Sequence, residues 1–286
     1  MASDVHPPWP VVRDAVSRAL AEDLLPLGDL SASLVPEDAT ATLELMVREE
    51  GVIAGQRCAE ETFRQLDERL AVEWLLPDGS SVQSGDLVAR FSGSLRPMLT
   101  AERTALNFLG RLSGIATLTR KFVDVAARES AAVRVLDTRK TTPGLRALEK
   151  AAVRAGGGHN HRGSLSDAVL VKDNHLVGVS ITEAIVRARQ MWPGRFVEIE
   201  CDRIEQVEEA CSAGASGILL DNMDPNQVAE CVKLVAALNP HSPPLLEVSG
   251  GITLENVAEY AATGVDLISV GALTHSAPVL DLGLDG

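Results

Sequence analysis

The chain has 286 residues, of which 45% are hydrophobic, so it can bury a sizeable core as one large domain or two ordinary ones. Its formal net charge of −14 argues against a nucleic-acid partner, which requires a basic face, and no apolar run approaches the ~18 residues of a membrane span. The amino-terminal residues show neither a basic segment nor an apolar one, so we expect a cytoplasmic protein with no membrane association.

Residues 1–112 have the pattern of an α+β domain, with the arrangement of an open-faced sandwich. An amphipathic helix is expected at 8–24, a pair of strands at 40–55 and a second helix at 58–70. Residues 71–95 predict short strands broken by Asp-Gly and Ser-Gly turns.

A long helical stretch at 100–127 connects this domain to the rest of the chain. Thr100 is its expected N-cap, and Arg103 lies in its first turn. The buried face of this helix is assigned to leucines at helical spacing, namely Leu106, Leu109 and Leu112. Arg103 is therefore expected outside that face, where a surface pair with Glu102 is the simplest alternative to a functional role.

The second domain is expected at 113–274, with the tail 275–286 packing back on the first domain. Six short apolar runs occur here, and segments with helical periodicity separate the later ones. The runs are continuous rather than alternating, which is typical of parallel strands covered on both faces. The pattern predicts an incomplete α/β barrel, and a doubly wound sheet is the alternative. The runs are 133–138, 168–174, 196–202, 217–222, 245–251 and 267–273.

The residue that ends each run is informative, because α/β barrels place their chemistry at the carboxyl ends of the strands. The early runs end in cations, the middle runs in carboxylates and the last two in glycines. These residues are Arg139 and Lys140, Lys172, Glu200, Asp221, Ser249 with Gly250 and Gly251, and Gly271.

Positive charge is concentrated between Thr138 and His175. This segment holds seven basic and three acidic residues, a net charge of +4, whereas the rest of the chain holds 19 basic and 37 acidic residues, or −18. Like charges in one cavity repel, so the segment predicts a site for an anionic ligand.

The glycines after the last strands predict a phosphate site. Barrels often bind phosphate there, through backbone N–H groups and the start of a following helix, for which Thr253 is the expected N-cap. A tight turn without a ligand is the alternative. Glu200 and Asp221, on neighbouring strands, suit Mg²⁺, sugar hydroxyls, a developing positive charge or a general acid/base pair, and solvated loop carboxylates are the alternative.

Neither the histidines nor the cysteines have the spacing of a zinc motif. His159 and His161 share one strand face, but no third ligand follows, and we expect His161 to act with Arg162 in hydrogen bonding or anion binding. The cysteines are expected to be reduced core thiols: Cys58, Cys201, Cys211 and Cys231.

The motifs around these residues resemble those of the quinolinate phosphoribosyltransferase family. They are "DTRKTTPGLRALEKAAVRAGGGHNHR", "LVKDNH", "EIECD", "LLDNM", "EVSGGI" and "VGALTHS", and the resemblance also covers "TAERTALNFLGRLSGIAT". The family joins quinolinate to 5-phosphoribosyl 1-diphosphate with Mg²⁺, releasing CO₂ and diphosphate and forming nicotinate mononucleotide for NAD synthesis. One departure is Ala151, where the family commonly has an aromatic residue.

The resemblance implies a role for each matching residue. On the quinolinate and diphosphate side it places Thr138, Arg139, Lys140, His161, Arg162 and Lys172. On the ribose and metal side it places Glu200 and Asp221, and at the 5-phosphate Ser249, Gly250, Gly251, Val270, Gly271 and Ala272. It also implies a homodimer, or a higher oligomer, in which Arg103 enters the partner's site.

Two other functions remain open at this level. A related phosphoribosyltransferase-like protein associated with molybdenum transport shares the architecture and would act on another acceptor. Residues 76–93 also resemble the hairpin of biotinyl and lipoyl carriers, but 71–95 contain no lysine to which a cofactor could be attached.

Overall fold

Residues 5–286 are described by a computed structural model, in which the chain forms two units. The first unit comprises residues 5–120, 141–157 and 273–286, and the second comprises 121–140 and 158–272. No helix in the described part of the chain has both the length and the apolar character to cross a membrane.

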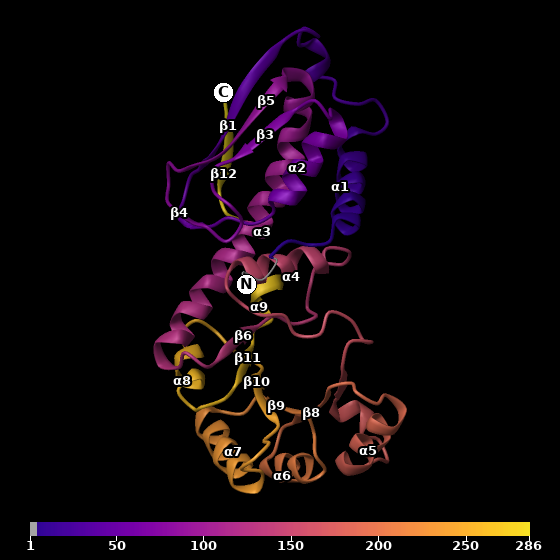
Figure 1. The fold of residues 1–286 in the computed structure, drawn as a ribbon, viewed down its shortest axis with the longest axis vertical. Helices are drawn as coiled ribbons and strands as arrows, with labels where there is room; N and C mark the ends of the chain where they lie inside the picture. The colour runs from indigo at the N-terminus through magenta and orange to yellow at the C-terminus, as the bar shows by residue number, and fades with distance from the viewer. Residues whose placement is uncertain (1–4) are drawn as a thin grey trace. The chain divides into compact units, whose positions relative to one another are not determined.

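The first unit contains an antiparallel sheet of four strands in the order β12-β1-β5-β3, and Figure 1 shows β1, β3 and β5 side by side. The described elements are α1 (Trp9–Leu24), a 3₁₀ turn (Ala32–Leu34), β1 (Thr40–Val47), β2 (Gly51–Val52), α2 (Gln56–Leu66), β3 (Ala71–Trp74), β4 (Ser81–Val82), β5 (Leu87–Ser94), α3 (Leu95–Glu129), α4 (Arg146–Ala155), α9 (Ala272–His275) and β12 (Leu282–Asp285).

The core of this unit lies between the sheet and the helices α2 and α3. Phe91 of β5 stacks on Phe63 of α2, with ring centroids 4.3 Å apart, and meets Trp74 edge-on. Because β12 pairs with β1, the C-terminal tail belongs to this unit.

The second unit contains a parallel sheet of six strands in the order β6-β11-β10-β9-β8-β7. Each of the six apolar runs forms one of these strands, so the predicted parallel architecture is confirmed. The described elements are β6 (Arg134–Leu136), β7 (Val169–Val171), a 3₁₀ turn (Asp173–His175), α5 (Ile181–Met191), β8 (Val197–Cys201), α6 (Ile204–Ser212), β9 (Gly217–Asp221), α7 (Pro225–Leu238), β10 (Leu245–Ser249), α8 (Val257–Ala261) and β11 (Leu267–Ser269).

Three local predictions are wrong. Thr100 is not an N-cap, because α3 already begins at Leu95 and the Thr100 hydroxyl donates within the helix to the carbonyl of Arg96. The strands predicted at 40–55 exist but do not pair with each other, since β1 pairs with β5 and β12 while β2 pairs with β4. Thr253 does not cap a helix either, because α8 begins only at Val257.

The cysteines lie where the sequence predicts them. All four are free and buried, and burial raises the pKa of Cys58 and Cys201 to about 12 each. Thiols with such high pKa values are poor nucleophiles and poor metal ligands at neutral pH.

Candidate active site

A cavity of about 520 Å³ lies in the second unit, at the carboxyl ends of its strands. It brings together most of the predicted site residues, with additional residues from the sheet. It is lined by Thr138, Arg139, Lys140, His161, Arg162, Leu170, Lys172, Glu200, Leu219, Asp221, Asn222, Glu247, Ser249, Gly250, Gly251 and Ser269.

The middle strands supply this cavity with acidic and hydroxyl groups. Glu200 of β8 is level with Leu219 of β9, and Asp221 is level with Ser249 of β10. The ammonium group of Lys172, directly after β7, forms an ion pair with Glu200. A cation and a carboxylate therefore already neutralise each other at one side of the cavity.

The other side of the cavity has an excess of positive charge. Arg139 and Arg162 both line this side, and burial together with the like charge of Arg139 lowers the pKa of the Arg162 guanidinium. Arg162 donates from Nη1 to the carbonyl of Ala168, at 3.0 Å, whereas the buried Nε of Arg139 has no partner among the described residues. An anion entering here would relieve the repulsion and accept from the orphaned donor.

The loop that follows β10 contributes two glycines to the cavity wall. Gly250 and Gly251 have φ angles of 96° and 63°, values that favour glycine. A Cβ atom on Gly250 would lie 2.2 Å from the side-chain oxygen of Asn222, so no larger residue fits. The helical part of the predicted phosphate site is wrong, however, because no helix starts directly behind this pair of glycines.

Not every predicted residue lies at this cavity. Val270, Gly271 and Ala272 are not among its lining residues, and Ser269 of β11 takes their place. Arg103 belongs to the first unit, where its side chain is exposed on α3. Their predicted roles stay predictions.

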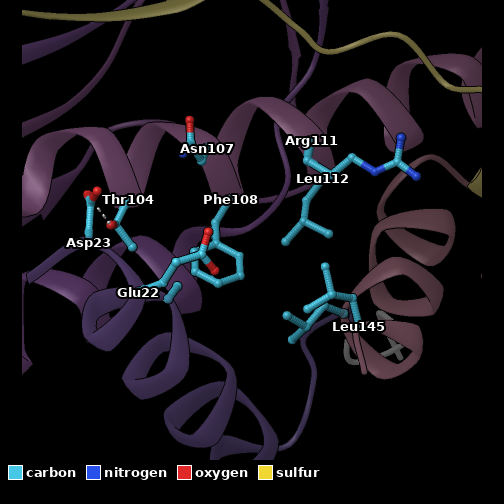
Figure 2. Close-up of a pocket in the computed structure, with 10 residues that line it drawn as sticks. Glu22, Asp23, Thr104, Asn107, Phe108, Arg111, Leu112 and Leu145 are labelled. Carbon is cyan, nitrogen blue, oxygen red and sulfur yellow. Dashed lines mark hydrogen bonds between the residues drawn. The ribbon is translucent and has the colours of Figure 1, made fainter. Parts of the chain in front are cut away.

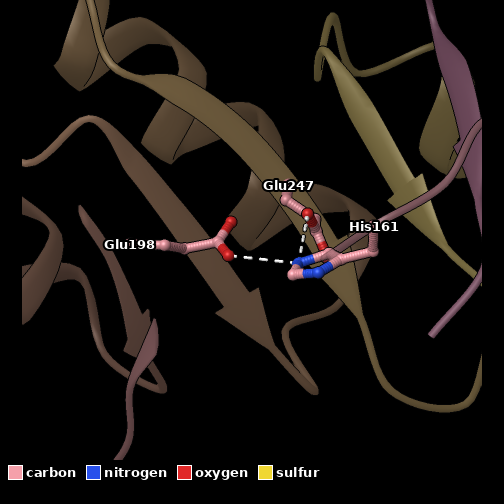
Figure 3. Close-up of side chains that lie close together, drawn as sticks. All are labelled: His161, Glu198 and Glu247. Atoms are coloured by element: carbon pink, nitrogen blue, oxygen red, sulfur yellow. Dashed lines mark hydrogen bonds and ion pairs between the residues drawn. The ribbon is translucent and has the colours of Figure 1, made fainter. Parts of the chain in front are cut away.

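Below the mouth of the cavity, His161 lies between two buried glutamates (Figure 3). Its Nε2 is 3.1 Å from Oε2 of Glu198 and 3.4 Å from Oε2 of Glu247. Burial alone would lower the pKa of His161, but hydrogen bonds and charge from both carboxylates raise it to about 10. Burial raises the pKa of Glu198, so the three side chains together hold an extra proton at neutral pH. This proton lies between Nε2 of His161 and the carboxylates, because Nδ1 accepts the backbone N–H of Arg162.

The loop that carries His161 is held by a buried aspartate. Asp137, at the end of β6, accepts from the side chain of Asn160 at 2.6 Å and from the backbone N–H of His161 at 2.9 Å. His159 forms a bridge to Leu136 of β6, so it extends the sheet while His161 faces the cavity.

A second cavity, of about 240 Å³, lies in the first unit (Figure 2). Its lining is mixed, with Glu22 and Asp23 of α1 facing Phe108 and Leu112 of α3. Its one lining cation, Arg111, is paired with Glu149 at 2.9 Å. Two carboxylates and a neutralised arginine do not suit an anionic ligand, so this cavity differs from the first in the charge of the ligand that it could bind.

Comparison with known proteins assigns the architecture. The family profile described as "Quinolinate phosphoribosyl transferase, C-terminal domain" matches residues 115–285, and the corresponding N-terminal profile matches residues 29–113. The chain belongs to the quinolinate phosphoribosyltransferase family.

Members of this family with similar sequences and structures come from several bacteria. A nicotinate-nucleotide pyrophosphorylase [carboxylating] of Mycobacterium leprae is 43% identical over the full length of both chains. A probable nicotinate-nucleotide pyrophosphorylase [carboxylating] of Bacillus subtilis is 42% identical over 90% of this chain and 88% of its own. The structure of the nicotinate-nucleotide pyrophosphorylase from Francisella tularensis has a TM-score of 0.92, at 37% identity, and covers 99% of this chain and 98% of its own.

Sequence reasoning missed the two buried glutamates of the site, Glu198 and Glu247, and it also missed the lining residues Leu170, Leu219, Asn222 and Ser269. Both glutamates lie inside the apolar runs, two residues before Glu200 and Ser249, respectively. Side chains two apart on a strand share a face, and a glutamate within a buried strand needs a partner. That combination was the available signal.

Proposed function

We propose that this protein transfers the phosphoribosyl group of 5-phosphoribosyl 1-diphosphate to quinolinate. The products are nicotinate mononucleotide, CO₂ and diphosphate, so the enzyme is a pentosyltransferase that supplies NAD biosynthesis. Membership of the quinolinate phosphoribosyltransferase family supports this. The observation that carries the proposal is that Arg139, Lys140 and Arg162 line the same cavity and that the buried Nε of Arg139 has no partner among the described residues, because a ligand with two adjacent carboxylates would neutralise these cations.

The residues of the cavity suit the two parts of the reaction. Arg139, Lys140 and Arg162 would hold the carboxylates of quinolinate and orient the ring nitrogen toward the ribose. As the bond from ribose C1 to the diphosphate breaks, positive charge develops on the sugar, and the carboxylates of Glu200 and Asp221 would stabilise it. The ring nitrogen then forms the new bond to C1.

Decarboxylation follows on the same ligand. Once the nitrogen carries the ribose, the ring is positively charged, and the bond to the adjacent carboxylate breaks with its electron pair remaining on the ring carbon. CO₂ leaves and a proton replaces it. Cations around the ring favour this step because they stabilise the electron pair.

We also propose that Glu200 and Asp221 hold Mg²⁺ together with the diphosphate substrate. Carboxylate oxygens are the ligands that Mg²⁺ prefers, and the amide of Asn222 donates to Asp221 at 2.7 Å, which orients the second carboxylate. When bound, the metal would neutralise charge on the leaving diphosphate. Because Lys172 is paired with Glu200, we expect the diphosphate to draw the ammonium group away when the metal binds.

The assembly is proposed to be a homodimer with shared sites. Arg103 is an exposed cation on α3 with Asn107 one turn away, also exposed. In a two-fold dimer such a residue of one subunit reaches the cavity of the other, and each site is completed by both chains. The free, buried cysteines are compatible with a reducing compartment, so we place the enzyme in the cytoplasm.

The purified protein provides the test. It should form nicotinate mononucleotide from quinolinate and 5-phosphoribosyl 1-diphosphate, with one CO₂ and one diphosphate released for each product. Nicotinate is the matched control, since it lacks one carboxylate and would leave part of the positive wall uncompensated. Equal turnover of nicotinate, or no turnover of quinolinate, would contradict the proposal.

A further inference from the structure

Glu198 and Glu247 are unusual residues for the interior of a parallel sheet. They are 3% and 1% exposed, on strands whose inward positions in such folds mostly hold branched aliphatic side chains. Burying carboxylates is costly, and a hydrophobic pair of similar volume is often no less stable. Stability therefore does not explain why both are present here, where Glu247 lines the cavity.

Both glutamates contact the same side chain, that of His161, which in turn contacts the main chain of Arg162. Both carboxylates approach Nε2 of His161, at 3.1 Å and 3.4 Å. The opposite ring nitrogen, Nδ1, accepts the backbone N–H of Arg162 at 2.7 Å. The imidazole ring is thus held at both nitrogens and connects the glutamates to the main chain of Arg162.

Arg162 is the part of this chain of contacts that faces a ligand. Its guanidinium lines the cavity and donates from Nη1 to Ala168. A rotation of the imidazole would remove the acceptor of the Arg162 N–H, and the main chain that carries the guanidinium would lose this restraint.

We propose that Glu198 and Glu247 are positioning residues, which fix the ring of His161 and through it hold Arg162 in place to bind a carboxylate of quinolinate. This role rests on the proposed function for the identity of the ligand. The relay, which runs from the two glutamates through His161 to the main chain of Arg162, requires only the contacts among these residues.

A metal ion is the other use of one imidazole and two carboxylates that lie within 4.8 Å of one another. The hydrogen bonds already account for this arrangement, because Nε2 contacts both carboxylates and Nδ1 is occupied by the Arg162 N–H. A metal would have to displace these contacts, and the neighbouring guanidinium groups would oppose it.

If the glutamates act through their charge, removing one should affect quinolinate binding in the opposite direction from that expected if they position His161, so the relay can be tested. Removing a buried negative charge below the cavity should strengthen the binding of a dianion by simple electrostatics. Removing the contact that orients His161 should weaken that binding. Glu247 is the better position for the test, since it contacts His161, whereas Glu198 also acts on Arg162 directly through its charge.

The experiment compares Glu247→Leu with Glu247→Gln in the full-length protein, by calorimetric titration with quinolinate alone. Gln keeps an acceptor for His161 and should bind within about twofold of the unchanged protein. Leu removes one of the two acceptors of Nε2, leaving only Glu198 at 3.1 Å, and should bind about tenfold more weakly, the loss expected for one hydrogen bond to an ionised group. Equal or tighter binding by Glu247→Leu would overturn the relay, and a thermal melt shows whether each variant is folded.

A double-mutant cycle shows whether the effect passes through Arg162. In an Arg162→Ala background the penalty of Glu247→Leu should fall to less than about twofold, because the residue that it positions is absent. An undiminished tenfold penalty would mean that Glu247 contacts the ligand itself, and the relay would be wrong.

Hydrogen–deuterium exchange tests the relay without any ligand. The N–H of Arg162 has Nδ1 of His161 as its acceptor, so its exchange should become faster in Glu247→Leu and remain unchanged in Glu247→Gln. Unchanged exchange in both variants would overturn the relay. Failure of the unchanged protein to bind quinolinate would instead overturn the proposed function, and the exchange data would still decide the relay.

Discussion

Two buried glutamates, one in each unit, differ in how many of their carboxylate oxygens have hydrogen-bond partners. Glu149 of α4 is fully buried in the first unit, and its oxygens accept from Arg111 at 2.9 Å and from the hydroxyl and the N–H of Thr142 at 2.8 and 3.0 Å. Glu247 in the second unit uses Oε2 for His161, while its buried Oε1 has no partner among the described residues.

The difference separates a structural carboxylate from one at a site. Glu149 connects Thr142 to Arg111 of α3. Arg111 also donates to the carbonyls of Thr274 and Ala277 near the C-terminus. Its hydrogen-bonding capacity is used within the protein. Glu247 lines a cavity, and its Oε1 has no hydrogen-bond partner among the described residues. A buried acceptor without a partner costs stability, and such costs are expected at sites that must accommodate a ligand.

The largest expected effect is on the structural side of this comparison. Glu149→Ala should lower the free energy of unfolding by about 3 kcal/mol, because it leaves the guanidinium of Arg111 in place without its carboxylate. Urea denaturation measures the change. Glu60→Ala, at an exposed position of α2, is the matched control and should change it by less than about 0.5 kcal/mol. If the two variants unfold alike, the structural role of Glu149 is wrong.

In the cavity of the second unit, Lys140→Ala and Lys172→Ala should reduce activity and not stability. Both lysines face the cavity rather than the core, so we expect kcat/KM to fall at least about a hundredfold, as for the loss of one transition-state contact. Melting temperatures should stay within a few degrees. Near-normal turnover of either variant would show that the reaction takes place elsewhere.

The shared-site dimer can be tested by mixing two inactive variants. Arg103→Ala and Lys172→Ala are combined after reversible dissociation. If Arg103 acts on the partner's cavity, half of the randomly formed dimers contain one intact site, and roughly a quarter of the original activity returns. If Arg103 acts within its own chain, no site is complete. No recovery after demonstrated subunit exchange would therefore contradict the shared site.

A further expected effect concerns the pH dependence of stability. The pKa of His161 is raised from its ordinary value near 6.5 to about 10, so protonation stabilises the folded state fully below about pH 6.5, and this stabilisation is lost as the pH rises to 10. The melting temperature of the unchanged protein should exceed that of His161→Gln most near pH 6, and the gap should narrow toward pH 10. A gap that is constant with pH would show that His161 has no raised pKa.

Much of this architecture could be predicted because its signals are local. The six apolar runs are short and continuous, as buried parallel strands require, and every one of them forms a strand. The cavity then gathers Arg139, Lys172 and Asp221 because the ends of neighbouring parallel strands meet at one edge. The failures at Thr100 and Thr253 have a local origin too: an N-cap residue type marks a helix start only if the preceding residues cannot continue the helix and the following ones can.

By itself, the sequence determined which residue types stand at the strand ends, and hence that an acidic protein has a cavity with a cationic wall. Only the tertiary structure decided which buried groups support that wall. His161, Glu198 and Glu247 are far apart in the chain, and they meet because the order of the sheet brings β8 and β10 to either side of β9, below the loop held by Asp137. Whether a buried carboxylate is satisfied or keeps a free oxygen depends on these distant neighbours, and no local pattern records them.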